Sequence, residues 1–233
     1  ALDPAAVEAA IRPENIHYPP TGLIALENTH NRAGGTVLSP DNIQAIAQVA
    51  ARHRLPLHLD GARIFNAAVA LGLSAAELAA PFKSVMFCLS KGLSAPVGSI
   101  IVGPREWIER ARKWRKRLGG GMRQAGILAA AGLVALETMV ERLAEDHEHA
   151  RLLAEGLGNL PGCAVVPPQT NMVLVDVAGT GLSAADFVAR LAEHGVLAGD
   201  TAPTKVRLVT HKDVDRKGIE YALAAAGKVV KGE

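Results

Sequence analysis

The stretch "LPLHLDGARIFNAA", Leu55–Ala68, decides the fold of this chain. Every second residue from Leu55 to Leu59 is a leucine, as in a short buried strand, and the run then ends in Asp60 and a glycine. In open α/β sheets, ligands bind at the carboxyl ends of the strands, so this pattern predicts that Asp60 lies at a binding edge. The alternative is that Asp60 is the N-cap of a helix that begins at Ala62.

Short apolar runs and helix-length spacers continue on both sides of this stretch. Ser39 stands in the capping position of the preceding helix, and Pro40 stands at its first helical position. Strands that are separated by helices imply crossover connections, so we predict an α/β fold with a mostly parallel sheet. The other elements that we predict here are strands at residues 22–28, 84–90 and 97–103 and a helix at residues 62–71.

The pattern changes after residue 104. A long and mostly helical region covers residues 105–158, with an interruption at the glycines 119–121. We therefore predict a large domain in residues 1–154 and a smaller C-terminal α+β domain in residues 155–233. For the smaller domain we predict strands at residues 164–166, 172–177 and 206–211, a helix that opens at Ser183 and a helix at residues 213–228.

Composition narrows the class of protein. The chain has 233 residues, of which 49% are hydrophobic and 21% charged, which suits a folded chain with a normal core. The net charge of +2 is too small to imply a polyanionic partner. The two cysteines, Cys88 and Cys163, have no metal-type spacing and suit a reducing compartment. No apolar run approaches the roughly 18 residues of a membrane span. We expect a soluble, cytoplasmic protein without a cleavable leader, a membrane partner or a metal site.

A lysine follows the next predicted strand. Lys91, in "CLSKGLSAPVGS", comes one helix-plus-strand unit after Asp60, so both side chains are expected at the same edge of the sheet. A lysine among small residues can be desolvated, which favours the neutral amine that Schiff-base chemistry needs. A carboxylate is the partner that a pyridinium nitrogen needs. The pair therefore predicts pyridoxal phosphate chemistry, whereas an ordinary surface lysine is the alternative.

Five motifs occur in the order found in a known enzyme family. They are "LENTHN", "HLDGARIFNA", "CLSKGLSAPVGS", "LGGGMRQAGILAAA" and "VRLVTHKD", and they span nearly the whole chain. In these motifs the chain resembles the low-specificity L-threonine aldolases. The resemblance implies pyridoxal 5'-phosphate as the cofactor and the aspartate-aminotransferase fold type.

The resemblance also implies roles for individual residues. Lys91 would form the covalent bond to the cofactor, and Asp60 would pair with its pyridine nitrogen. Arg63 would lie beside the cofactor and the substrate carboxylate. Arg207, in "KVRLVTH", would hold the α-carboxylate in a bidentate grip, although alone it reads as an ordinary strand-edge arginine. Arg123, in "GGGMRQ", would lie near the cofactor phosphate.

The implied reaction is aldol cleavage of L-threonine, L-allo-threonine and related β-hydroxy-α-amino acids to glycine and an aldehyde, in a dimer or tetramer. Another pyridoxal-phosphate reaction on the same fold, such as transamination or β-elimination, stays open, as does a non-catalytic fragment. The family's chains carry an earlier segment that holds the cofactor phosphate. We therefore expect these residues to be a part that lacks that segment and cannot work alone.

Some of the histidines are candidates for a role in the active site, and others receive none. His17 matches a family histidine near the substrate hydroxyl, so it is a candidate base and substrate contact, although alone it reads as a loop residue. His30 ends a buried strand and could face the active edge or be structural. His58 comes two residues before Asp60 and receives no role. We expect His147 and His149, on a charged helix, to be solvated.

A basic run and two glycine clusters suggest other sites. Trp107 and Trp114 lie on one helix face among arginines and lysines, a pattern that nucleic-acid-binding proteins also show. More often such a helix buries its tryptophan face, so we predict no nucleic-acid partner. Lys116 could assist Arg123 near the phosphate. The glycines at 34–35 and 119–121 neither follow a strand nor open a helix, so we predict turns rather than phosphate loops.

Overall fold

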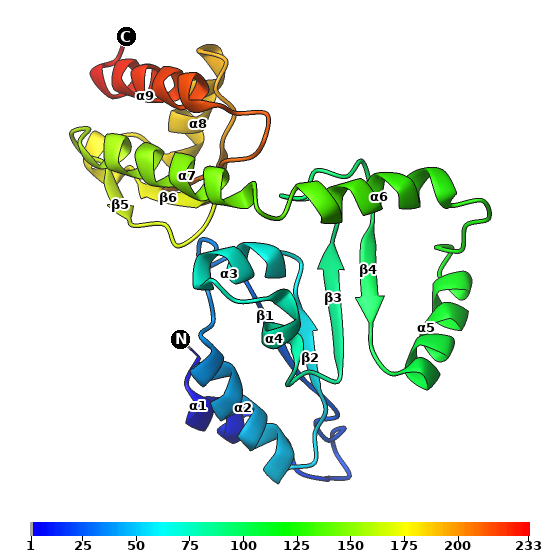
Figure 1. The fold of residues 1–233 in the computed structure, drawn as a ribbon. Coiled ribbons are helices and arrows are strands. Elements are labelled where there is room, and N and C mark those ends of the chain that lie inside the picture. The colour runs from blue at the N-terminus through cyan, green and yellow to red at the C-terminus, as the bar shows by residue number, and fades with distance from the viewer. Residues whose placement is uncertain (1) are drawn as a thin grey trace. The chain divides into compact units, whose positions relative to one another are not determined.

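The computed structural model describes residues 2–233, which form two compact units (Figure 1). The first unit comprises the chain up to Thr29 and Val37–Val140. The second comprises His30–Thr36 and Glu141–Glu233, so a short segment from the first half of the chain belongs to the second unit. Within residues 2–233, no helix is both long and apolar enough to cross a membrane.

The first unit is built on a four-stranded sheet in the order β1-β2-β3-β4 (Figure 1). The first three strands run parallel, as the sequence predicted, and β4 pairs antiparallel with β3. The connection from β3 to β4 is too short for a crossover helix, which explains the reversed direction. The strands are β1 (Ile24–Glu27), β2 (Leu57–Asp60), β3 (Ser84–Cys88) and β4 (Ser99–Val102).

Helices pack on this sheet through regularly spaced apolar residues. Helix α2 begins as predicted, because the Ser39 side chain accepts a hydrogen bond from the Asn42 N–H and Pro40 follows. Ile43 and Ile46 of α2 and Ile64 of α3 are almost fully buried in one core with the strands. The helices of this part are α1 (Pro4–Ala9), α2 (Pro40–Arg52), α3 (Ile64–Leu71) and α4 (Ala75–Ala79).

Two further helices complete the first unit, α5 (Arg105–Arg117) and α6 (Gly126–Thr138). A turn separates them at the predicted glycines, where Gly119 has a φ of 84°. The expectation that the helix buries its tryptophan face is wrong for Trp114, which is 59% exposed, with the Arg117 guanidinium over its ring. No residue of α5 is buried.

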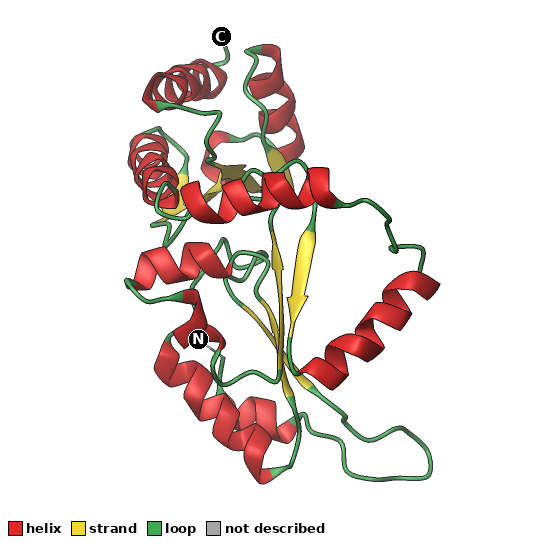
Figure 2. Ribbon diagram, turned by 45° about the vertical axis from the view of Figure 1, so that its right-hand side comes forward, coloured by secondary structure: helices red, strands yellow, loops and turns green. Residues whose placement is uncertain are grey.

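The second unit has an antiparallel sheet in the order β5-β6-β8-β7. Figure 2 colours the strands of the chain yellow and its helices red. Three helices pack on one face of this sheet around the fully buried Phe187. Helix α8 begins at the predicted Ser183 cap, whose side chain accepts from the Asp186 N–H. The strands are β5 (Ala164–Val166), β6 (Met172–Asp176), β7 (Gly199–Ala202) and β8 (Lys205–Val209), and the helices are α7 (Leu143–Gly158), the 3-10 turn Ala178–Thr180, α8 (Ala184–Glu193) and α9 (Arg216–Lys231).

Helix α7 differs from the sequence-based expectation in two respects. The predicted domain boundary at residue 154 falls inside α7, which as a whole packs on β5, β6 and α9 of the second unit. His147 and His149, expected to be solvated, are 8% and 6% exposed. They lie at helical spacing from the core residues of α7, so packing of this face buries them. Burial lowers the pKa of His147 to about 4.

The segment His30–Thr36 leaves β1 and returns before α2. The residues that flank this segment belong to the first unit and are joined by two hydrogen bonds. The buried Asn28 side chain accepts from the Leu38 N–H at 3.2 Å and donates to the Leu38 carbonyl oxygen at 3.3 Å. The predicted glycine turn is present, with Gly34 at a φ of 80° and Gly35 at 74°. Only glycine adopts such backbone conformations without strain.

Candidate active site

Asp60 ends β2, with Glu27 of β1 and Met86 of β3 as its neighbours in the parallel register. The Asp60 Oδ1 accepts a hydrogen bond of 3.0 Å from the Ala62 N–H, and the side chain is half-buried. Asp60 is not the N-cap of the next helix, because α3 begins only at Ile64. The carboxylate thus stands at the carboxyl edge of the sheet, where ligands bind in α/β folds.

A glycine lets β2 and β3 approach each other beside this carboxylate. The Gly61 N–H donates to the Met86 carbonyl oxygen at 2.8 Å, and a Cβ at Gly61 would lie 2.9 Å from that oxygen. Arg63 follows in the N-cap position of α3, where its carbonyl oxygen accepts from the Asn66 N–H at 3.0 Å. The structure therefore places Arg63 on the same turn as Asp60.

Lys91 lies three residues beyond the end of β3, the strand beside β2, so Asp60 and Lys91 leave neighbouring parallel strands at the same edge, as predicted. A backbone hydrogen bond and two buried leucines hold the loop that carries Lys91. The Lys91 carbonyl oxygen accepts from the Ser94 N–H at 2.8 Å, and Leu89 and Leu93 are buried. The Lys91 side chain itself is exposed, so the desolvation expected from its small neighbours is absent in residues 2–233. Serines and glycines are too small to cover it.

The other candidate residues of the first unit lie on loops. His17 is exposed, and its N–H donates to Asn15 Oδ1 at 2.9 Å. Arg123 is exposed in the turn between α5 and α6, and Lys116 is exposed in the last turn of α5. His58 faces the same side of β2 as Asp60 and bonds through Nδ1 to Ser84 Oγ at 2.8 Å. That bond ties β2 to β3.

The second unit contains Arg207 and His30. Arg207 lies in the middle of β8 and pairs in register with Leu174 of β6. Its Nη1 donates a hydrogen bond of 3.0 Å to Asn31 Oδ1, which belongs to the segment His30–Thr36. The Nδ1 of His30 accepts from the Ala33 N–H at 3.1 Å, which gives this ring a structural contact within the same turn.

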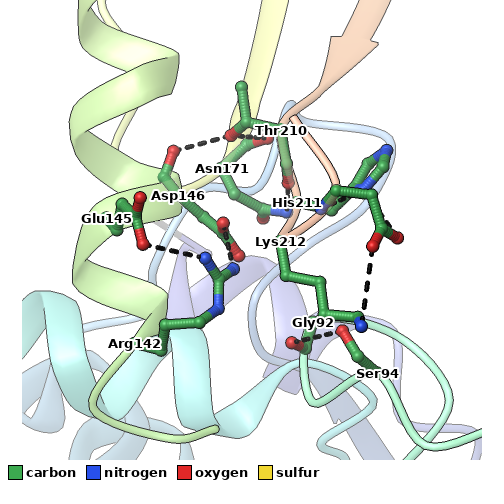
Figure 3. A network of polar contacts seen from close by, with 10 residues as sticks. Gly92, Ser94, Arg142, Glu145, Asp146, Asn171, Thr210, His211 and Lys212 are labelled. Carbon is green, nitrogen blue, oxygen red and sulfur yellow. Dashed lines mark hydrogen bonds and ion pairs between the residues drawn. The ribbon is translucent and has the colours of Figure 1, made fainter. Parts of the chain in front are cut away.

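A buried polar network in the second unit was not foreseen from the sequence (Figure 3). Arg142 forms an ion pair with Asp146, whose side chain is fully buried. The Thr210 hydroxyl donates to the Asp146 carbonyl oxygen at 2.6 Å, and Asn171 Nδ2 donates to the Thr210 carbonyl oxygen at 2.9 Å. Burial raises the pKa of Asp146 despite the Arg142 contact. The only sequence signal was the arginine and aspartate spaced four residues apart on one helix.

The residues present fit a pyridoxal phosphate site. Asp60 keeps Oδ2 as an acceptor for a protonated ring nitrogen, while Lys91 offers a primary amine at the same edge. Arg63 of the same unit is a cation of the kind that can bind a carboxylate or a phosphate. The donors of the first unit are thus of the kinds that an anionic aldehyde cofactor requires.

Comparison with known proteins identifies related sequences. The model of the beta-eliminating lyase family matches residues 1–180. The chain is 44% identical over 228 residues to low-specificity L-threonine aldolase 1 of Arabidopsis thaliana, an alignment that covers 96% of this chain and 64% of that protein. The resemblance to this group of enzymes is thereby confirmed. The chain spans 64% of the length of the low-specificity L-threonine aldolases that it matches.

Solved structures show the same fold. A threonine aldolase of Leishmania major matches with a TM-score of 0.80 at 20% identity, covering 98% of this chain and 67% of that one. An aspartate aminotransferase variant of Thermus thermophilus matches with a TM-score of 0.70 at 20% identity, covering 98% and 63%. At 20% sequence identity these matches show the fold alone. They confirm the predicted α/β fold class of the aspartate-aminotransferase type.

Proposed function

The chain belongs to the beta-eliminating lyase family, and we propose that the protein is a pyridoxal-phosphate lyase that cleaves L-threonine and L-allo-threonine to glycine and acetaldehyde. The observation that carries the proposal is the position of Asp60 and Lys91 at the carboxyl ends of two neighbouring parallel strands. The 44% identity to a low-specificity L-threonine aldolase supports this choice of substrate.

Each candidate residue has a chemical task in this proposal. The cofactor, when bound, supplies an electron sink for the bond that breaks. Lys91 Nζ anchors the cofactor, and Asp60 Oδ2 holds a proton on the ring nitrogen. Arg207 binds the substrate α-carboxylate through its planar guanidinium, with Arg63 as a second cation.

Two loop residues would contact the substrate hydroxyl and the cofactor phosphate. His17 takes the proton of the substrate β-hydroxyl, a task for a histidine with a free ring nitrogen. Arg123 contributes positive charge to the cofactor phosphate, and Lys116 is the weaker candidate for that task. We further propose a cytoplasmic homo-oligomer, a location that suits the two unpaired cysteines Cys88 and Cys163.

Two measurements on the full-length protein test the proposal. Reduction with sodium borohydride is expected to fix the cofactor on Lys91, as located by peptide mass spectrometry. Incubation with L-threonine is expected to release glycine and acetaldehyde in equal amounts. Labelling of a different lysine would remove Lys91 from its role, and a product other than glycine would remove the cleavage reaction.

A second candidate reaction is β-elimination, which the name of the matched family favours. The same Lys91 and Asp60 would serve it, because the fold and the cofactor anchors do not decide the bond that breaks. Elimination from L-threonine produces a keto acid and ammonia instead of glycine and an aldehyde. Product analysis therefore separates the two reactions in one experiment.

A further inference from the structure

The loop that carries His17, between α1 and β1, closes on itself. At its two ends, the Arg12 N–H donates to Thr21 Oγ1 at 2.9 Å, and the Thr21 N–H donates to the Arg12 carbonyl oxygen at 3.2 Å. The Arg12 guanidinium carbon also lies 5.9 Å from the centre of the Tyr18 ring. A loop whose ends meet in this way is an Ω-type loop, a form that frequently carries functional residues.

A tight turn inside this loop contains His17. Asn15 and Tyr18 form an isolated antiparallel bridge, with Ile16 and His17 as the turn residues between them. The Asn15 Oδ1 accepts a hydrogen bond of 2.9 Å from the His17 N–H. An asparagine side chain that bonds the backbone two residues further on forms an Asx turn. The Asn15 side chain therefore holds the His17 backbone.

Packing within residues 2–233 does not hold this turn. Residues 12–20 are all exposed, and Ile16 is 94% exposed. Among the same described residues, the His17 ring has no hydrogen-bond or ion-pair partner. A catalytic base is ordinarily oriented by a further group. Here the direction of the imidazole depends on the backbone turn, and that turn depends on the acceptor of Asn15.

From this geometry we propose that Asn15 is a positioning residue, which fixes the His17 backbone and thereby directs the imidazole toward the substrate β-hydroxyl. The inference rests on the proposed function, in which His17 takes the proton of that hydroxyl. The Asn15 bond goes to the main chain of His17, and an amide is neutral. Asn15 therefore acts on the position of the imidazole and not on its charge.

A double-mutant cycle in the full-length holoenzyme tests this coupling, with kcat for L-threonine cleavage as the measured quantity. His17→Asn removes the base and is expected to lower kcat by about a hundredfold. Asn15→Ala is expected to lower kcat by about tenfold, because a small misplacement of a catalytic group slows the reaction strongly. In the His17→Asn background, Asn15→Ala is expected to have no further effect, since no base is left to position.

Two variants separate positioning from general damage to the loop. Asn15→Asp keeps an oxygen acceptor at the same reach, so kcat is expected to stay within about threefold of the wild-type value. Arg12→Ala is the matched control, because it removes the contact with the Tyr18 ring but keeps the backbone groups that bond Thr21. It is expected to leave kcat unchanged.

Two further measurements do not depend on turnover. Hydrogen–deuterium exchange of the full-length protein is expected to be faster at the turn in Asn15→Ala but not in Asn15→Asp, because only the alanine variant deprives the His17 N–H of its acceptor. Glycine lacks the β-hydroxyl that His17 contacts in the proposed function. Its affinity for the holoenzyme, measured by absorbance titration, is therefore expected to be the same in wild type and Asn15→Ala.

The outcomes distinguish this inference from the proposed function. If His17→Asn leaves kcat unchanged, the role of His17 in the proposed function is wrong, and this inference with it. If His17→Asn lowers kcat but Asn15→Ala does not, this inference alone is overturned. It is also overturned if Asn15→Ala lowers kcat as much in the His17→Asn background as in wild type. An equal loss in Arg12→Ala, or an equal loss of glycine affinity, would overturn it too, because general damage would then explain the effect.

Discussion

The hydroxyl of Thr210 donates a hydrogen bond of 2.6 Å to the backbone carbonyl oxygen of Asp146, which joins the end of β8 to the first turn of α7. Thr210 is 1% exposed, so the loss of its hydroxyl removes a buried hydrogen-bond donor from the Asp146 carbonyl oxygen. We expect Thr210→Val, which preserves the shape of the side chain, to lower the free energy of unfolding by about 1–3 kcal/mol. Urea denaturation checks the value. Thr201→Val, which removes an exposed hydroxyl bond at 3.3 Å, is the control and is expected to change little.

The burial of His147 implies that the free energy of unfolding depends on pH. The pKa of His147 in the folded protein is about 4, against an ordinary value of 6.5, because burial disfavours the imidazolium. Above about pH 6.5 neither state is protonated and the stability is complete. As the pH falls from 6.5 toward 4, only the unfolded state takes up the proton, so stability falls, by about 3 kcal/mol in total.

The variant His147→Gln isolates this effect. Its free energy of unfolding is expected to fall less than that of wild type between pH 7 and about 4, a window set by the pKa of His147. The comparison is needed because the raised pKa of Asp146 acts in the opposite direction, with stability lost as the pH rises. Parallel pH profiles of the two proteins would contradict the assignment to His147.

Removing the charge of Asp60 is expected to slow catalysis without changing the structure. Asp60→Asn keeps an oxygen that can accept from the Ala62 N–H, but it removes the charge that holds a proton on the ring nitrogen. We expect kcat for L-threonine cleavage to fall by about 10²-fold or more, the scale of losing one preorganised electrostatic partner. The melting temperature is expected to stay near that of wild type. Near-normal turnover would remove Asp60 from its proposed role.

The substitution Gly35→Ala is expected to lower stability for two reasons, backbone strain and overpacking, which a second glycine variant can separate. Gly35 has a φ of 74°, and a Cβ there would lie 2.6 Å from Thr170 Oγ1. Gly195 has a φ of 75°, but a Cβ there would meet nothing within 4 Å among residues 2–233 apart from its chain neighbours, so Gly195→Ala carries only the backbone strain. We expect Gly35→Ala to lower the free energy of unfolding by about 1–3 kcal/mol more than Gly195→Ala, because of overpacking. Equal losses in denaturant titrations would contradict the close approach.

The sequence predicted those parts of the fold that depend on local pattern. The alternating leucines before Asp60 and the Ser39 and Ser183 caps carry their signal within a few residues. The edge shared by Asp60 and Lys91 followed from a general rule for parallel strands, and the register confirms it.

Other features depend on contacts between distant residues, which local pattern does not encode. The Arg207–Asn31 bond spans 176 positions. The burial of His147 depends on what packs against α7, although the helix reads as charged. Strand β7 was missed because its sequence, "GDTA", has little of the β-branched or aromatic character that marks strands.

Helix α6 predicts self-association of residues 1–233 when they are expressed alone. Nearly all of its residues are apolar, a pattern of buried helices, yet only Gly132 and Ala135 are buried. Ile127 is 85% exposed and Leu133 58%. In the same unit, β4 exposes Ile100, Ile101 and Val102. Exposed apolar surface of this extent favours association in water.

The double variant Ile127→Glu with Leu133→Glu is expected to reduce this association, measured by light scattering coupled to size-exclusion chromatography. Leu197→Glu is the matched control, because Leu197 is also 85% exposed but lies outside α6 and β4, in the second unit. It is expected to leave the association unchanged, since the driving force is proportional to the contiguous apolar area removed from water and not to one exposed leucine. A monomeric wild-type chain, or equal dispersal by Leu197→Glu, would show that α6 is not the surface through which these residues associate.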